Sequence, residues 1–287
     1  MSYHYARNWD LDASDQFRIV GDSGAFSART QGVTITNDEL GEWANKWRHR
    51  LFWVACMDVA GNQALTRKNW TYLNTHYNLQ SVPSIHMGDD PKMMDYYVER
   101  GCDFLGLGGL AGGGEQPKAQ MRWLISVFKY ARKNHPHVRF HGWGLTKEET
   151  KRLPFWSVDS SSWGSGFRYG TVTLRNPRNG TRISYKTDGR CVYHPRVMEL
   201  LTKYYDTRPS DVAYSTPENR QHVVKVSALS MSVYEQSMRR LHRPGISAPT
   251  WGLMNTQGMR VDGPHVALAE GSSTNIRMLN DFKKGQL

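Results

Sequence analysis

Residues 17–24 read Phe-Arg-Ile-Val-Gly-Asp-Ser-Gly, a short and mainly apolar run that ends at Asp22 and continues into small residues. A second stretch, residues 154–162, is built the same way, because Pro-Phe-Trp-Ser-Val leads to Asp159 and three serines follow. In an α/β barrel, a strand that stops at a carboxylate presents that group at the active face. The two stretches therefore predict a barrel that carries both acidic side chains at one face.

Strand and helix patterns alternate throughout residues 17–159. Strand-like stretches occur at residues 17–21, 51–57, 82–87, 103–107, 138–144 and 155–158. Helix-like stretches separate them, at residues 37–50, 62–77, 90–100, 116–135 and 146–152. Asn37 is expected to cap the first of these helices. Such alternation indicates a parallel sheet, and polar or glycine-rich loops after several strands favour a (β/α)8 TIM-type barrel over a doubly wound sheet.

The pattern changes after residue 159. Residues 170–174 and 181–186 flank an Asn-Gly turn and predict a β-hairpin, and helices are expected at residues 196–205 and 220–242. The segment from Arg243 is rich in Gly, Pro, Ser and Asn and receives no assignment. We expect residues 1–165 to hold the barrel strands and active-site loops. Residues 166–287 are expected to be a basic hairpin and helical part that completes the barrel and binds nucleic acid.

Composition indicates a soluble protein of the reducing cytoplasm. The chain has 287 residues, of which 39% are hydrophobic, and its mean hydropathy is −0.63. No apolar run approaches the roughly 20 residues that span a bilayer, and the first residues lack the apolar core of a signal peptide. The three cysteines, Cys56, Cys102 and Cys191, are too widely spaced to predict a disulfide framework. We therefore expect no membrane partner.

Positive charge is concentrated in the second part of the chain. The net charge is +11; residues 160–287 hold 18 Lys and Arg against 9 Asp and Glu, whereas the first 159 residues hold 19 against 17. This asymmetry predicts a polyanionic partner, with nucleic acid as the leading candidate, although a generally basic soluble surface remains an alternative. The candidate phosphate contacts surround the predicted hairpin: Arg168, Arg175, Arg178, Arg182, Arg190 and Arg196.

Five short motifs follow one another in a specific order. They are Gly-Asp-Ser-Gly-Ala-Phe at 21–26, Val-Ala-Cys-Met-Asp at 54–58, Gly-Gly-Leu-Ala at 108–111, His-Gly-Trp-Gly at 141–144 and Val-Asp-Ser-Ser-Ser at 158–162. In this order they resemble the motifs of the tRNA-guanine transglycosylase (queuine tRNA-ribosyltransferase-like) superfamily. The resemblance covers residues 17–163 and continues more weakly to about residue 240. The chain looks most similar to phage-type relatives that insert 7-deazaguanine bases into DNA.

The resemblance implies an enzyme, a pentosyltransferase that replaces guanine in DNA with a free 7-deazaguanine base such as preQ0. It also implies a phage-encoded protein that acts in the host cytoplasm. The residues support this chemistry independently, because Asp159 can attack the anomeric carbon while Asp22 moves protons on the bases. The alternatives left open are a turn cap for Asp22 and a helix cap for Asp159. For the whole protein they are the same exchange on tRNA, a non-catalytic nucleic-acid-binding barrel and a small-sugar hydrolase.

The resemblance also indicates which residues bind the base. Asp58 is the candidate reader of the purine edge, since a carboxylate accepts from a ring N–H and an amino group together; a helix cap is its alternative. Gly108, Gly109 and Leu110 belong to a loop expected to touch the base through its backbone. Further candidates are Ser23 and Gly24 beside Asp22, His86 where the family usually has a glutamine nearby, and His141 with Trp143. For the last three, core packing is the alternative.

A zinc site is a further candidate. The family carries three cysteines and a distant histidine, and Cys191, His194 and His222 have a similar outline here, with Asp188 as a fourth ligand. The competing interpretation is that these are unliganded surface residues. No organic cofactor is expected. Whether the chain forms a homodimer is left open by the sequence.

Overall fold

The computed structural model describes residues 1–14, 16–110, 117–258, 260–270 and 272–284. The chain forms two compact units. Unit 1 consists of residues 1–159 and 244–267, and unit 2 of residues 160–243 and 268–287. The sequence-based division at residue 165 therefore differs from the observed one, because residues 244–267 return to unit 1.

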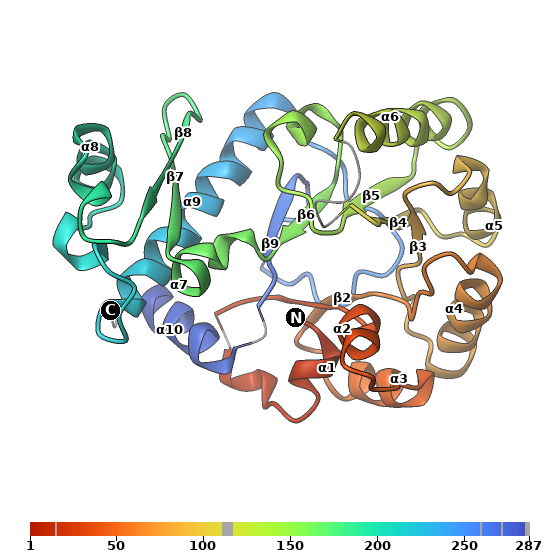
Figure 1. Cartoon of the computed structure of the whole chain (residues 1–287). Coiled ribbons are helices and arrows are strands. Elements are labelled where there is room, and N and C mark those ends of the chain that lie inside the picture. The colour runs from red at the N-terminus through yellow and green to blue at the C-terminus, as the bar shows by residue number, and fades with distance from the viewer. Residues whose placement is uncertain (15, 111–116, 259, 271, 285–287) are drawn as a thin grey trace. The chain divides into compact units, whose positions relative to one another are not determined.

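Unit 1 contains the alternating part of the chain (Figure 1). Its helices are α1 (Tyr3–Ala6), α2 (Ala25–Thr30), α3 (Asn37–Lys46), α4 (Gln63–Tyr77), α5 (Asp95–Val98) and α6 (Pro117–Asn134), with 3₁₀ turns η1 (Leu11–Ser14), η2 (Pro91–Met94) and η3 (Glu148–Arg152). Its strands are β1 (Ile19–Gly21), β2 (Leu51–Val54), β3 (Ser84–His86), β4 (Phe104–Gly108) and β5 (Arg139–Gly142). Strands β6 (Ser157–Ser160) and β9 (His265–Leu268) each extend one residue into unit 2.

The strands of unit 1 form separate sheets. β1 pairs with β2 in parallel, and a second sheet has the order β3-β4-β5-β6-β9, in which β3 to β6 are parallel. An isolated bridge between Ala55 and Val82 lies between the two sheets. The predicted (β/α)8 barrel is wrong, because the strands described here do not close into one. The physical reason is that the chain leaves β6 for the hairpin and helices of unit 2, so the barrel lacks the strands that would complete its ladder.

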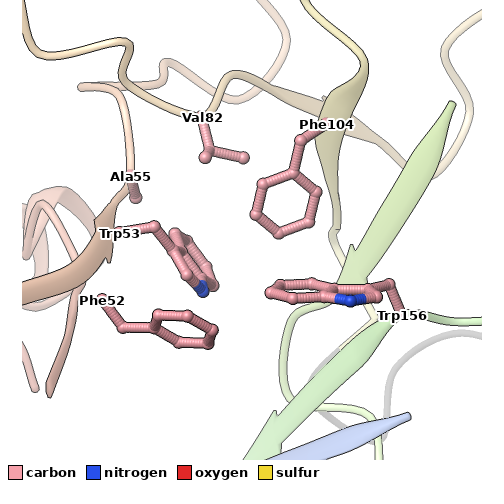
Figure 2. Close-up of a cluster of buried hydrophobic side chains, with 6 residues drawn as sticks. All are labelled: Phe52, Trp53, Ala55, Val82, Phe104 and Trp156. Atoms are coloured by element: carbon pink, nitrogen blue, oxygen red, sulfur yellow. The ribbon is translucent and has the colours of Figure 1, made fainter. Parts of the chain in front are cut away.

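One aromatic core joins the two sheets of unit 1. Figure 2 shows the rings of Phe52 and Trp53 from β2, Phe104 from β4 and Trp156 from just before β6 pointing toward one another, with Ala55 and Val82 beside them. Trp53 and Trp156 are fully buried. Burying a side chain of this size stabilises a fold by roughly 2–3 kcal/mol. The core therefore packs β2, the start of β4 and the residue before β6 against one another.

Local signals explain where the helices begin. Thr36 caps α3 in a capping box with Glu39, so the predicted cap at Asn37 is one residue late. Asn62 caps α4, since its side-chain oxygen accepts from the Leu65 amide at 3.0 Å. The caps place both helices immediately before their parallel strands.

The returning segment of the chain is bound to unit 1 through polar contacts. The Asp103 carboxylate accepts hydrogen bonds from the backbone amides of Thr250 and Trp251, both at 2.8 Å. Arg139 donates to the Ser247 carbonyl at 2.9 Å. These contacts explain why the segment from Arg243, for which the sequence offered no assignment, ends in β9 beside β6.

Unit 2 is built on the predicted hairpin. Strands β7 (Thr171–Arg175) and β8 (Arg182–Lys186) pair in an antiparallel register, and α9 (Arg220–Leu241) packs on β7. The other elements are α7 (Ser165–Tyr169), α8 (Pro195–Tyr204), α10 (Ser273–Lys283), η4 (Ser162–Gly164), η5 (Cys191–Tyr193) and η6 (Pro209–Val212). Among the described residues, no helix combines the length and apolar character needed to cross a membrane.

Candidate active site

The candidate residues of unit 1 lie where its parallel strands end. Asp22 directly follows β1, His86 is the last residue of β3, Trp143 directly follows β5, and Asp159 lies within β6. Asp58 comes four residues after β2. Ligands of parallel α/β sheets bind at the carboxyl ends of the strands. The carboxyl ends of these parallel strands therefore hold the candidate residues that were predicted to lie at the active face of a barrel.

Three carboxylates, Asp22, Asp58 and Asp159, lie at or just beyond the carboxyl ends of parallel strands in these two sheets. The pKa of Asp22 is raised to about 6, first because the surrounding protein removes its solvation, and further by the negative charges of Asp159 and Asp58. The charged amino terminus and the Gly24 amide, which donates to Asp22 Oδ1 at 3.2 Å, oppose this rise. The charges of Asp159 and Asp58 therefore act on Asp22 in the folded protein and disfavour its ionised form.

Asp58 forms an ion pair with His86. The distance between His86 Nε2 and Asp58 Oδ2 is 2.7 Å, and both side chains are largely buried. Burial lowers the pKa of His86, but the hydrogen bond and charge of Asp58, helped by the charge of Asp89, raise it overall. His86 Nδ1 is buried and has no hydrogen-bond partner. Asp58 is not a helix cap, since Asn62 caps the helix that follows.

Gly108 makes room for the His86 ring. A Cβ at this position would lie 2.7 Å from His86 Cδ2 and 2.9 Å from Nε2. The sequence predicts that Gly108 lets the backbone approach a flat base. In the structure, the space that a side chain at Gly108 would take is occupied by the His86 ring. Gly109 has a φ of +71°, a conformation that favours glycine. Leu110 is buried, and its carbonyl accepts from Gln120 at 3.4 Å; Ala111 lies outside the described residues.

Asp159 is held by the turn that follows β5. The Gly144 amide donates to Asp159 Oδ1 at 2.6 Å, and His141 Nε2 lies 3.5 Å from the same oxygen. Asp159 lies within a strand, and the N-cap of the next turn, η4, is Ser161. The helix-cap alternative for Asp159 therefore does not describe the structure.

His141 and Trp143 pack against the aromatic core. His141 lies edge-to-face between Trp53 and Trp143, with ring centroids 4.8 Å and 4.3 Å away. Trp143 is half-buried and donates its indole N–H to Ser84 Oγ at 3.0 Å. His141 is fully buried, so only Trp143 of this pair retains an exposed part. Ser84 was not among the sequence candidates.

The turn after β1 is tightly packed. Ser23 is buried, and a side chain at Gly24, which has a φ of +76°, would meet the His4 amide nitrogen at 2.8 Å. Phe26, four residues beyond Asp22, is 74% exposed. Phe26 belongs to the first motif but is not among the predicted site residues. An aromatic residue beside a candidate catalytic carboxylate was the available signal.

The candidate arginines of unit 2 fall into two groups. Arg168, Arg178 and Arg182 are exposed, as are Arg190 and Arg196. Arg175 is buried: its guanidinium lies over the Tyr234 ring, 4.8 Å from the centroid, and donates to Ser230 Oγ at 3.3 Å. Arg175 therefore contributes to the interior of unit 2, while the other five remain accessible to phosphates.

The metal candidates are also in unit 2. Cys191 Sγ lies 3.5 Å from Asp188 Oδ2. Within the described residues, which include Cys191, His194 and His222, no group of three His, Cys, Asp or Glu side chains is arranged to hold a metal ion.

Comparisons with known proteins give no family assignment. No family model, no curated protein and no solved structure matches the chain.

Proposed function

We propose that this protein is a transglycosylase that exchanges guanine in DNA for a 7-deazaguanine base by double displacement. The proposal rests on the position of Asp22, Asp58 and Asp159 at or just beyond the carboxyl ends of parallel strands. The raised pKa of Asp22 supports it. One carboxylate that attacks and a second whose raised pKa suits it to proton transfer are what nucleophilic and acid–base steps at a sugar carbon require. The order of the five motifs supports guanine as the departing base.

In the first displacement, Asp159 attacks the anomeric carbon. A bond forms between its carboxylate oxygen and C1′, the bond between C1′ and N9 breaks, and the electron pair of that bond goes to guanine. The departing guanine takes the proton of Asp22. A carboxyl group with a pKa of about 6 still carries a proton in a useful fraction of molecules near neutral pH.

In the second displacement, the roles reverse. The Asp22 carboxylate removes the N9 proton of the incoming 7-deazaguanine, N9 bonds to C1′, and the ester to Asp159 breaks with its electron pair returning to the carboxylate. Asp22 is thereby protonated again. Two inversions give net retention at C1′.

The Asp58–His86 pair is the proposed reader of the base. Asp58 accepts hydrogen bonds from the purine edge, while His86 Nδ1, buried and without a hydrogen-bond partner, meets a polar group of the base. The exposed ring of Phe26 offers an aromatic face on which a flat base stacks.

Unit 2 is the proposed site of nucleic-acid binding. It holds 17 Lys and Arg against 8 Asp and Glu, a net charge of +9. The exposed Arg168, Arg178 and Arg182 are the proposed phosphate contacts. A target base within a duplex must be flipped out to reach a carboxylate, and melted DNA avoids that cost.

The test is a base-exchange assay. Single-stranded DNA, duplex DNA and tRNA are each incubated with the protein and preQ0, digested to nucleosides and analysed by mass spectrometry. We expect a deazaguanine nucleoside from DNA, and a protein–DNA adduct that survives denaturation. Exchange on tRNA alone would replace the proposed substrate, and guanine release without uptake of preQ0 would indicate a hydrolase. Binding with no base release from either nucleic acid would contradict the proposal.

A further inference from the structure

A buried histidine lies against the carboxylate to which the proposed function assigns nucleophilic attack. His141 is completely shielded from solvent, yet its Nε2 has no hydrogen-bond partner. The nearest acidic oxygen is Asp159 Oδ1, at 3.5 Å. An unsatisfied buried polar atom is costly to a fold, so its retention beside a reactive group calls for a reason.

The surroundings of His141 fix the direction of its ring. Nδ1 is hydrogen-bonded to Ser157 Oγ at 2.8 Å, and the ring is enclosed by Trp53 and Trp143. If the Ser157 hydroxyl donates to Nδ1, the hydrogen of the imidazole is on Nε2, the nitrogen that lies 3.5 Å from Asp159 Oδ1. The opposite tautomer would turn a lone pair toward a carboxylate, which is repulsive. The contacts therefore favour Nε2–H.

Within the described part of the chain, Asp159 is contacted at one oxygen. The Gly144 amide donates to Oδ1 at 2.6 Å, and His141 Nε2 lies 3.5 Å from that same atom. Catalytic hydrogen bonds are often long in an empty site and shorten when substrate is bound.

We infer that His141 is a positioning residue that, together with the Gly144 amide, anchors Asp159 through Oδ1 and leaves Oδ2 as the oxygen that attacks C1′. This inference rests on the proposed function for the identity of the reaction, but its geometry does not depend on turnover. Ser157 takes part by fixing the tautomer of His141, so the chain from Ser157 through His141 to Asp159 aims the nucleophile. His141 itself touches no substrate.

Two substitutions separate aiming from packing. In His141→Gln the side-chain amide reaches the position of Nε2 and still donates toward Asp159, whereas in His141→Asn it reaches only the position of Nδ1. We expect adduct formation with DNA to slow about 10- to 100-fold in His141→Asn and about fivefold or less in His141→Gln, with DNA affinity unchanged in both. Equal rates in the two variants, whether both normal or both slow, would overturn the inference.

A second measurement is independent of activity. In ¹⁵N-histidine-labelled protein, we expect the His141 signals to show the hydrogen on Nε2, and the Nε2 signal to move in Asp159→Asn. A hydrogen on Nδ1, or an Nε2 chemical shift that is the same in Asp159→Asn as in wild type, would contradict the inference. If wild-type protein forms no adduct with DNA or tRNA, the proposed function fails, while the NMR result still decides the position of His141.

Discussion

The two units of this protein use charge in different ways. Unit 1 is nearly neutral, with 20 Lys and Arg against 18 Asp and Glu, but three of its carboxylates lie at or just beyond the carboxyl ends of parallel strands. Unit 2 has a net charge of +9, and its candidate arginines are spread over exposed positions, apart from the buried Arg175. The difference shows that the proposed reactivity depends on where the strands place a few charges, whereas the proposed binding to a polyanion depends on how many charges are accessible.

The largest effect is expected from neutralising a carboxylate of unit 1. Asp159→Asn should reduce base exchange about 10⁴-fold or more and abolish the covalent adduct, because an amide oxygen is a poor nucleophile. Asp206→Asn, the same change at an exposed position of unit 2, is the matched control and should exchange normally. Exchange by Asp159→Asn at the wild-type rate would contradict the division of labour between the units.

A substitution at Gly108 of unit 1 tests whether the Asp58–His86 ion pair requires the space that this glycine leaves for the His86 ring. In Gly108→Ala the new methyl group would lie 2.7 Å from His86 Cδ2, so the ring must move. We expect a loss of about 1–3 kcal/mol in the free energy of unfolding, measured by urea denaturation. The pKa of His86 should also fall as its contact with Asp58 weakens.

The control for Gly108→Ala is Gly88→Ala. A methyl group at Gly88 would meet no atom within 4 Å, although the positive φ there adds backbone strain. If Gly108→Ala leaves both the stability and the His86 titration unchanged, the ring is not held as described.

The raised pKa of Asp22 predicts that the stability of the folded protein depends on pH. The Asp22 pKa is raised from 3.8 to about 6 in the folded protein, so the charged form is disfavoured and the native state loses stability as pH rises from 4 through 6. Asp22→Asn removes this charge while keeping an oxygen for the Gly24 amide. We expect the variant to be more stable than wild type by about 3 kcal/mol at pH 8.

The gain in Asp22→Asn should be small at pH 4 and disappear below about pH 3, where the wild-type carboxyl group is protonated in both states. Urea denaturation at pH 4, 6 and 8 checks this. A stability difference that is constant across these pH values would show that Asp22 is not buried among negative charges.

The smallest effect is expected from exposed arginines of unit 2. The double variant Arg178→Gln with Arg182→Gln should weaken DNA binding about tenfold. The negative slope of log K against log salt should become shallower by about 2, since two phosphate contacts are lost. Arg132→Gln with Lys133→Gln, a matched neutralisation at the end of α6 in unit 1, should leave the slope unchanged. Equal slopes for the two double variants would contradict a binding role for the hairpin.

Much of unit 1 follows from local sequence patterns. The expected strands at 17–21, 51–57, 82–87, 103–107, 138–144 and 155–158 each contain or overlap an observed strand, because short apolar runs between capped helices have few other solutions. The acidic residues that end β1 and lie within β6 were identified for the same reason. The hairpin of unit 2 was also predicted, from its Asn-Gly turn.

The features that the sequence did not predict correctly depend on contacts between residues far apart in the chain. Barrel closure is a property of the whole strand order, and the local patterns of residues 160–243 predict the hairpin without showing that its strands stay apart from the main sheet. The burial of Arg175 requires Tyr234 and Ser230, more than 50 residues away. The seat that Gly108 provides for His86 likewise exists only once β3 and β4 are paired.

The most direct test of this account is a titration of the Asp22 carboxyl carbon by ¹³C NMR, in wild type and in Asp159→Asn, without any substrate. The account predicts an apparent pKa of about 6 in wild type, and a lower value in the variant because one neighbouring negative charge is gone. An ordinary pKa near 4, or a raised value that Asp159→Asn does not change, would contradict the convergence of the two carboxylates on which the proposed chemistry depends.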